Sequence, residues 1–235
     1  MKKTIALGAI SAMALTGYAY SEIESEFHVG YNSTYVWRGQ DLGDSMYEYG
    51  IDVAGSCDCG LDWAAGIWYA NPSDAGSNDE LDIYGGVSKD FGFGTAEVGF
   101  IHYEFDENGN DNTEAYLSLG TGFAGVDLGA AIYYVFDGSL SNNPIWGELS
   151  AEYGYDISDK ISASVGLGLG TTLDPDGGDG YSVYTANVGL SYAVSDSISV
   201  NPYIAFSDTT GYNAASIGTP NFSGVYGGVS IGFSF

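Results

Sequence analysis

The chain ends with Tyr226-Gly227-Gly228-Val229-Ser230-Ile231-Gly232-Phe233-Ser234-Phe235, in which an apolar residue or glycine stands at every second place back from Phe235. Successive side chains of a β-strand point to opposite faces, so this segment predicts a strand with one apolar face. A tilted strand of about 9–11 residues is long enough to cross the hydrocarbon core of a membrane. The ending therefore favours a membrane-spanning strand.

The same period of two recurs along most of the chain. Residues 24–38 place Phe27, Val29 and Tyr31 on one face, with Glu26 and His28 on the other. Twelve such strands are predicted: Glu24 to Arg38, Met46 to Ala54, Leu61 to Ala70, Glu80 to Ser88, Thr95 to Phe105, Glu114 to Gly120, Val126 to Phe136, Trp146 to Tyr155, Ile161 to Thr171, Val183 to Val194, Ile198 to Ser207 and Val225 to Phe235. An even number is typical of a bacterial single-chain barrel. The sequence predicts an all-β fold, a single transmembrane antiparallel up-and-down β-barrel of about 12 strands.

One predicted strand changes phase. Between Thr95 and Phe105, apolar residues move from the even positions Val98 and Phe100 to the odd position Ile101 and beyond. A β-bulge, or emergence of the strand from the membrane, would explain this change.

The connections alternate between short and long, as in outer-membrane barrels with periplasmic turns and extracellular loops. The predicted inner turns are Gly55 to Gly60, Lys89 to Gly94, Thr121 to Gly125, Asp156 to Lys160 and Ser195 to Ser197. The predicted outer loops are Gln40 to Ser45, Asn71 to Asp79, Asp106 to Thr113, Asp137 to Pro144, Leu173 to Gly180 and Asp208 to Asn221.

The first residues have the pattern of a secretory signal. Lys2 and Lys3 precede the apolar run from Thr4 to Leu15, and Gly17-Tyr18-Ala19 offers small residues for cleavage. The run is too short to cross a core of about 30 Å as a helix. We expect a signal peptide over residues 1–19, a barrel over residues 20–235, and Sec export to the bacterial outer membrane.

A secreted β-sandwich would also show alternation and glycine-rich turns. Aromatic residues near strand ends favour the barrel instead, since they form girdles at both membrane interfaces. The residues assigned to these girdles are Tyr35, Trp37, Tyr69, Tyr153, Tyr155, Phe233 and Phe235. The terminal segment also resembles the C-terminal signal read by the barrel-assembly machinery, an expected partner together with outer-membrane lipid and lipopolysaccharide.

Residues 31–39 read Tyr-Asn-Ser-Thr-Tyr-Val-Trp-Arg-Gly. This stretch resembles the Y-V-[FW]-R-G motif of the uncharacterised Gcw_chp family, whose members look like small outer-membrane barrels. Members usually continue R-G-x-S-Q, whereas this chain continues Gln40-Asp41-Leu42 after Gly39. The resemblance implies a barrel and no substrate.

Acidic residues dominate the predicted inner face. The chain carries a net charge of −26, which becomes −28 if Lys2 and Lys3 leave with the signal, so nucleic acid is excluded as a partner. With apolar faces toward lipid, Arg38 is the single fixed positive charge inside. The predicted pore-lining residues are Arg38, Glu48, Asp52, Asp62, Glu80, Asp82, Glu97, Glu114, Asp127, Glu148 and Glu152. We expect Arg38 to pair with an inward carboxylate, with Glu48 the best candidate.

Catalytic, cofactor and metal sites are not expected. Ser230 lies in a G-x-S-x-G match but inside a strand, without the helix and later His of a nucleophile elbow. Cys57 and Cys59 could form a turn disulfide or stay reduced. Acidic loops at residues 106–112 and 174–179 lack EF-hand spacing, so solvated loops are favoured over Ca²⁺ sites.

Two functions remain after these exclusions. The favoured one is a porin-like, cation-selective passive diffusion channel for small cationic or neutral solutes, because carboxylates in a confined lumen concentrate cations. The alternative is a closed structural or surface-interaction barrel with acidic extracellular loops. Inward aromatic residues such as Trp68 and Tyr84 either bind a ring-shaped solute or, as we favour, fill space and form hydrogen bonds.

Overall fold

The computed structural model describes residues 23–73, 79–106, 111–138, 145–173, 180–211 and 221–235. The predicted signal peptide at residues 1–19 and most of the acidic loops at 106–112 and 174–179 lie outside these ranges. Across the described residues there are twelve strands: β1 Glu24–Trp37, β2 Gln40–Ser56, β3 Asp62–Asn71, β4 Glu80–Asp90, β5 Thr95–Phe105, β6 Asn112–Phe123, β7 Val126–Gly138, β8 Ile145–Ser158, β9 Ile161–Thr172, β10 Ser182–Ser195, β11 Ile198–Thr210 and β12 Gly224–Ser234.

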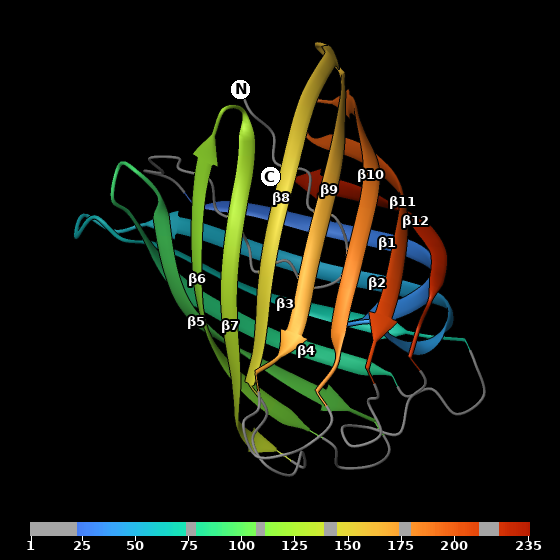
Figure 1. Ribbon diagram of the computed structural model, residues 1–235. Coiled ribbons are helices and arrows are strands. Elements are labelled where there is room, and N and C mark those ends of the chain that lie inside the picture. The colour runs from blue at the N-terminus through green and yellow to red at the C-terminus, as the bar shows by residue number, and fades with distance from the viewer. Residues whose placement is uncertain (1–22, 74–78, 107–110, 139–144, 174–179, 212–220) are drawn as a thin grey trace.

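The strands form one closed antiparallel barrel (Figure 1). Each strand pairs with the next, and β12 closes the ring against β1, with Phe27 opposite Phe233. Backbone hydrogen bonds in both directions join Ser25 and Phe235 beside this seam. Closure leaves no sheet edge unpaired, which the membrane interior requires. The predicted fold class is confirmed.

Alternation separates two faces on every strand. Large apolar side chains such as Leu167, 61% exposed, and Val98, 52% exposed, cover the outer face. The intervening residues point into the barrel, where Tyr133 and Glu114 are almost fully buried. Because the apolar band faces outward and the polar groups face inward, the barrel is suited to a lipid bilayer. Across the described residues, no helix is long and apolar enough to cross a membrane.

The phase change predicted in β5 is not a bulge. The register is continuous on both sides of β5, so its odd residues face inward throughout. Glu97, Ile101 and Tyr103 are all buried inside, whereas Phe100 is exposed outside. The apolar residues change side because the interior itself becomes apolar along this strand.

Five short turns lie at one end of the barrel, as predicted; this end is called the turn end and the opposite one the loop end. They connect β2 to β3, β4 to β5, β6 to β7, β8 to β9 and β10 to β11. In the first of them, Cys57 and Cys59 form a disulfide. The structure thus selects one of the two states that the sequence left open.

The first predicted outer loop is wrong. Residues 40–45 are not a loop but the beginning of β2, and the hairpin turns at Arg38 and Gly39, which have positive φ angles of 47° and 73°. The pairing of β1 with β2 also shifts between Tyr35 and Val36. Such an irregularity bends a strand and alters the direction of its side chains.

The structure corrects two of the predicted girdle residues. Tyr35 and Trp37 do not face lipid: Tyr35 is 4% exposed and packs on Trp68, and Trp37 packs on Tyr103. Val36, which lies between them, is 5% exposed, so residues on both faces of this end of the hairpin are covered. The pairing of β1 with β12 ends at Asn32, and beyond it the hairpin tip lies inside the barrel. By contrast, the predicted girdle residues Tyr153, Tyr155 and Phe235 are exposed.

Candidate functional site

The predicted acidic lining residues lie on the inward-facing positions of their strands, opposite in phase to the exposed apolar residues, whereas Arg38 lies in the β1–β2 turn. The buried carboxylates are Glu48, Glu80, Asp82, Glu97 and Glu114. Partly exposed ones are Asp52, Asp62, Glu148 and Glu152, and Asp127 is exposed near the turn end of β7. Carboxylates therefore extend along the interior from the turn end to the loop end.

Aromatic donors hold most of these carboxylates in place. The hydrogen bonds run from Trp68 to Glu48 at 3.3 Å, Tyr84 to Asp52 at 2.6 Å, Tyr35 to Glu80 at 2.7 Å, Tyr103 to Glu114 at 3.2 Å, Trp146 to Glu148 at 2.6 Å, and Tyr116 to Glu97. Trp68 and Tyr84, which were predicted to face inward, thus act as hydrogen-bond donors as well as filling space. Each donor fixes the orientation of an acid that would otherwise be free to turn.

Glycines let these side chains lie flat on the wall. A Cβ atom on Gly66 would lie 2.5 Å from both the Tyr84 ring and the Asp52 carboxylate. A Cβ atom on Gly99 would lie 2.5 Å from the Tyr116 hydroxyl. The inward glycines therefore provide the space over which neighbouring rings and acids lie, along the wall rather than across the lumen.

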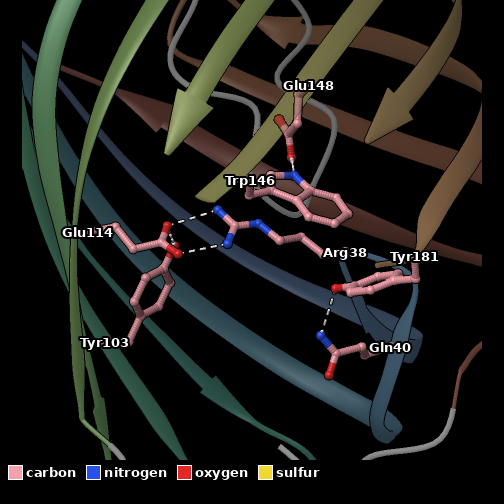
Figure 2. Close-up of polar contacts among 7 residues, drawn as sticks. All are labelled: Arg38, Gln40, Tyr103, Glu114, Trp146, Glu148 and Tyr181. Atoms are coloured by element: carbon pink, nitrogen blue, oxygen red, sulfur yellow. Dashed lines mark hydrogen bonds and ion pairs between the residues drawn. The ribbon is translucent and has the colours of Figure 1, made fainter. Parts of the chain in front are cut away.

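Arg38 reaches away from its own hairpin (Figure 2). Its two terminal nitrogens donate to the two carboxylate oxygens of Glu114 on β6, at 2.7 and 2.8 Å. The prediction that Arg38 contacts an inward carboxylate is confirmed, but the preferred partner was wrong. Glu48 instead accepts a hydrogen bond from Trp68, because the turn at Arg38 directs the guanidinium away from β2.

Three aromatic rings surround the same guanidinium. Its Cζ atom lies 4.6 Å from the ring centroid of Trp37, 4.8 Å from that of Tyr133 and 5.3 Å from that of Trp146. Distances under about 6 Å are those of cation–π attraction. Burial acts to lower the pKa of Arg38, which lies in the turn outside the strands. The Glu114 carboxylate more than compensates, so the pKa stays above its usual value and the side chain is charged.

The tip of the β1–β2 hairpin is tied to distant parts of the barrel. Gln40 donates to the Tyr181 hydroxyl at 3.1 Å (Figure 2). Thr209 donates to the Gly39 carbonyl at 3.0 Å. In the closed ring, β7 and β8 lie opposite β1 and β2. Contacts of Arg38 with Tyr133 and Trp146 on those strands therefore place the tip across the lumen at the loop end.

An apolar cluster packs around this tip. It comprises Ile101, Tyr103, Tyr133, Trp146, Tyr181 and Val183, with Trp37 packed against it. Sequence analysis assigned neither Tyr103 nor Tyr181 to the interior. The position of Tyr103 could have been predicted from Glu97, because both residues lie at odd positions of the same strand and Glu97 was predicted to face inward. We call the tip and this cluster the neck of the barrel.

The turn end of the lumen is more polar. His28 lies 3.5 Å from Asp52 across the β1–β2 pair, and both side chains are partly exposed. Over the described residues, no group of three or more His, Cys, Asp or Glu side chains is arranged to hold a metal ion.

Comparison with known proteins gives the fold. No family model and no curated protein matches the sequence. The described barrel resembles the NanC porin with a TM-score of 0.54 and 13% identity, covering 89% of this chain and 98% of that one. The barrel also resembles the KdgM porin, with a TM-score of 0.53 and 12% sequence identity, covering 90% of this chain and 99% of that one. A third similar structure is the translocator domain of the autotransporter NalP from Neisseria meningitidis, with a TM-score of 0.58 and 13% sequence identity, covering 94% of this chain and 90% of that one.

Fold and interior together define a class, the outer-membrane type of β-barrel with a polar interior. Within it, the chain shares the architecture of porins such as NanC and KdgM at very low sequence identity. Resemblance of residues 31–39 to the Gcw_chp family stays a prediction.

Proposed function

We propose that the protein is a porin-like passive diffusion channel of the bacterial outer membrane that prefers cations. The observation that carries this proposal is the charge of the interior. Carboxylates line it along its whole length, whereas its one guanidinium, on Arg38, is already paired with Glu114. A confined lumen with excess negative charge concentrates cations and repels anions.

Two further features support a path for solutes. Inward rings lie over glycines such as Gly66 and Gly99, which keeps side chains close to the wall. The acids bonded to these rings, such as Asp52 bound by Tyr84, are held at fixed places along the wall. Small cationic or neutral solutes are the class that such a lining suits, and the proposal requires no cofactor and no catalytic step.

Reversal potentials in a KCl gradient across a planar bilayer test the proposal. The wild type should prefer K⁺, and Glu48→Gln with Asp52→Asn should reduce that preference, since both acids line the interior. Glu104→Gln is a matched control, because this acid on β5 is exposed and has the outward phase of Val98 and Phe100. Preference for Cl⁻ would reject cation selectivity, and absence of conductance would reject the channel.

The neck favours a second candidate, a closed structural or surface-interaction barrel. Arg38 and Glu114 are nearly inaccessible, with 6% and 2% of their side chains exposed, at the place where the hairpin tip crosses the lumen. A barrel sealed there would conduct no ions, so the same bilayer recording separates the two functions.

Location and partners follow from the same proposal. The outward apolar band fits outer-membrane lipid, and lipopolysaccharide is the lipid expected around the loop end. The barrel-assembly machinery would read the terminal strand, which closes the ring against β1. Detection of the protein in outer-membrane fractions as a heat-modifiable gel band tests these points.

A further inference from the structure

The neck contains a cage for a planar cation, built by the barrel wall. Glu114 comes from β6, Tyr133 from β7, and Trp146 and Glu148 from β8. Wall contacts that do not involve Arg38 hold these residues. Tyr103 donates to Glu114, Trp146 donates to Glu148, and the rings of Tyr116 and Tyr133 lie 5.8 Å apart. The cage residues are therefore held by contacts with the wall and not by Arg38 alone.

Its occupant comes from elsewhere in the ring. Arg38 lies in the two-residue turn of the β1–β2 hairpin, opposite β7 and β8 in the ring. Its side chain reaches Glu114 beside Trp146 (Figure 2). The guanidinium donates twice to Glu114 and lies against Tyr133 and Trp146. In this arrangement one carboxylate accepts two parallel hydrogen bonds and aromatic faces lie alongside, which selects a planar guanidinium over a spherical ion.

The charge of the cage exceeds that of its occupant. Glu114 and Glu148 both lie close to the single guanidinium, and the inner wall nearby carries Glu80 and Asp82. A cage that loses Arg38 is left with buried carboxylates, which are costly without a counter-charge. Withdrawal of the hairpin tip therefore costs less when another cation takes the place of Arg38.

We propose that Arg38 is a tethered occupant of a binding site for organic cations that carry a guanidinium group, and that such solutes exchange with it. The site deepens the proposed function, since it names the solute class that a cation-selective lumen would pass. A tethered group acts at an effective concentration of the order of millimolar. Free solutes therefore compete with Arg38 only at comparable concentrations, and the neck stays filled without them.

The test uses methylguanidinium as the probe and the full barrel in lipid vesicles. In Arg38→Ala the cage is vacant, so methylguanidinium should raise the thermal unfolding midpoint in a saturable way, because a ligand bound to the folded state stabilises it. Methylammonium, which has the charge without the planar fork, should raise it less. Arg38→Ala with Glu114→Gln should show no saturable rise.

Wild-type protein should bind methylguanidinium about ten-fold or more weakly than Arg38→Ala does, because Arg38 competes with the probe for the cage. Binding is measured by the change in tryptophan fluorescence. Failure of saturation in Arg38→Ala, equal stabilisation of the double variant, or no binding to the wild type at a hundred-fold higher concentration would each overturn the site. If Arg38→Ala does not assemble, Arg38→Lys is used instead, and methylguanidinium should raise its thermal unfolding midpoint by a smaller amount. No rise of the midpoint in Arg38→Lys would overturn the site.

Reversal potentials in KCl keep the two proposals apart. Potassium preference without probe binding rejects the cage and leaves the channel. Probe binding in a barrel that prefers chloride or does not conduct rejects the proposed function and leaves the cage.

Discussion

The guanidinium of Arg38 and the carboxylate of Glu114 form two parallel hydrogen bonds of 2.7 and 2.8 Å although 76 residues separate them in the chain. The pair links the tip of the β1–β2 hairpin to β6, so it fixes where the tip lies in the lumen. Its loss should therefore change both the stability of the barrel and the shape of the neck.

Glu114→Gln should destabilise the barrel by about 3–5 kcal/mol, since it leaves a buried guanidinium without its main counter-charge. Replacement of both partners by apolar residues, Arg38→Met with Glu114→Leu, should recover most of this loss. Urea unfolding in lipid vesicles measures both, with Glu104→Gln as the control at the outer surface. A cost of Glu114→Gln below about 1 kcal/mol would show that the pair contributes little.

Gly99→Ala should destabilise the barrel by about 1–3 kcal/mol, as overpacking of a filled site does. A Cβ atom there would lie 2.5 Å from the Gly85 carbonyl oxygen as well as from Tyr116, and backbone cannot move aside easily. Gly120→Ala is the matched control, because nothing lies within 4 Å of a Cβ atom at that position. Equal unfolding midpoints for the two variants in urea would contradict the packing of rings over glycines.

Deletion of Phe235 should impair assembly of the barrel. This residue exchanges backbone hydrogen bonds of 3.0 and 3.2 Å with Ser25 at the seam of β1 and β12. Phe123→Ala provides the comparison, since Phe123 and Phe235 are both 74% exposed but Phe123 is distant from the seam. The fraction of heat-modifiable, folded band on a gel should fall for the deletion and remain unchanged for Phe123→Ala. Full assembly of the truncated chain would oppose this role of the seam.

Trp37 should be shielded from lipid and Trp63 should not. Trp37 lies at the hairpin tip inside the barrel and packs on Tyr103, whereas Trp63 has the outward phase of the exposed Ile67 on β3. Variants that retain one of the four tryptophans, with Phe at the others, permit quenching by brominated lipid to be measured for each. Strong quenching of Trp63 alone is expected; similar quenching of Trp37 would place it back in the lipid-facing girdle.

The sequence by itself determined the barrel. The alternation of apolar and polar residues predicts the two faces of a strand, because successive side chains of a strand point to opposite sides. For that reason the last strand, the number of strands and the inward phase of acids such as Glu48 and Asp52 could all be predicted. Short turns between strands were equally predictable, since they are local.

Tertiary structure decided what depends on contacts across the ring. The alternation of β5 was ambiguous because the sequence shows which residues are apolar, but not that the interior near Ile101 and Tyr103 is apolar too. The inward position of Tyr35 depended on the end of the β1–β2 hairpin, which separates from β12 after Asn32 and lies inside the barrel. The pairing of Arg38 with Glu114 rather than Glu48 depended on a turn that directs the hairpin tip across the lumen, which spacing along the chain does not encode.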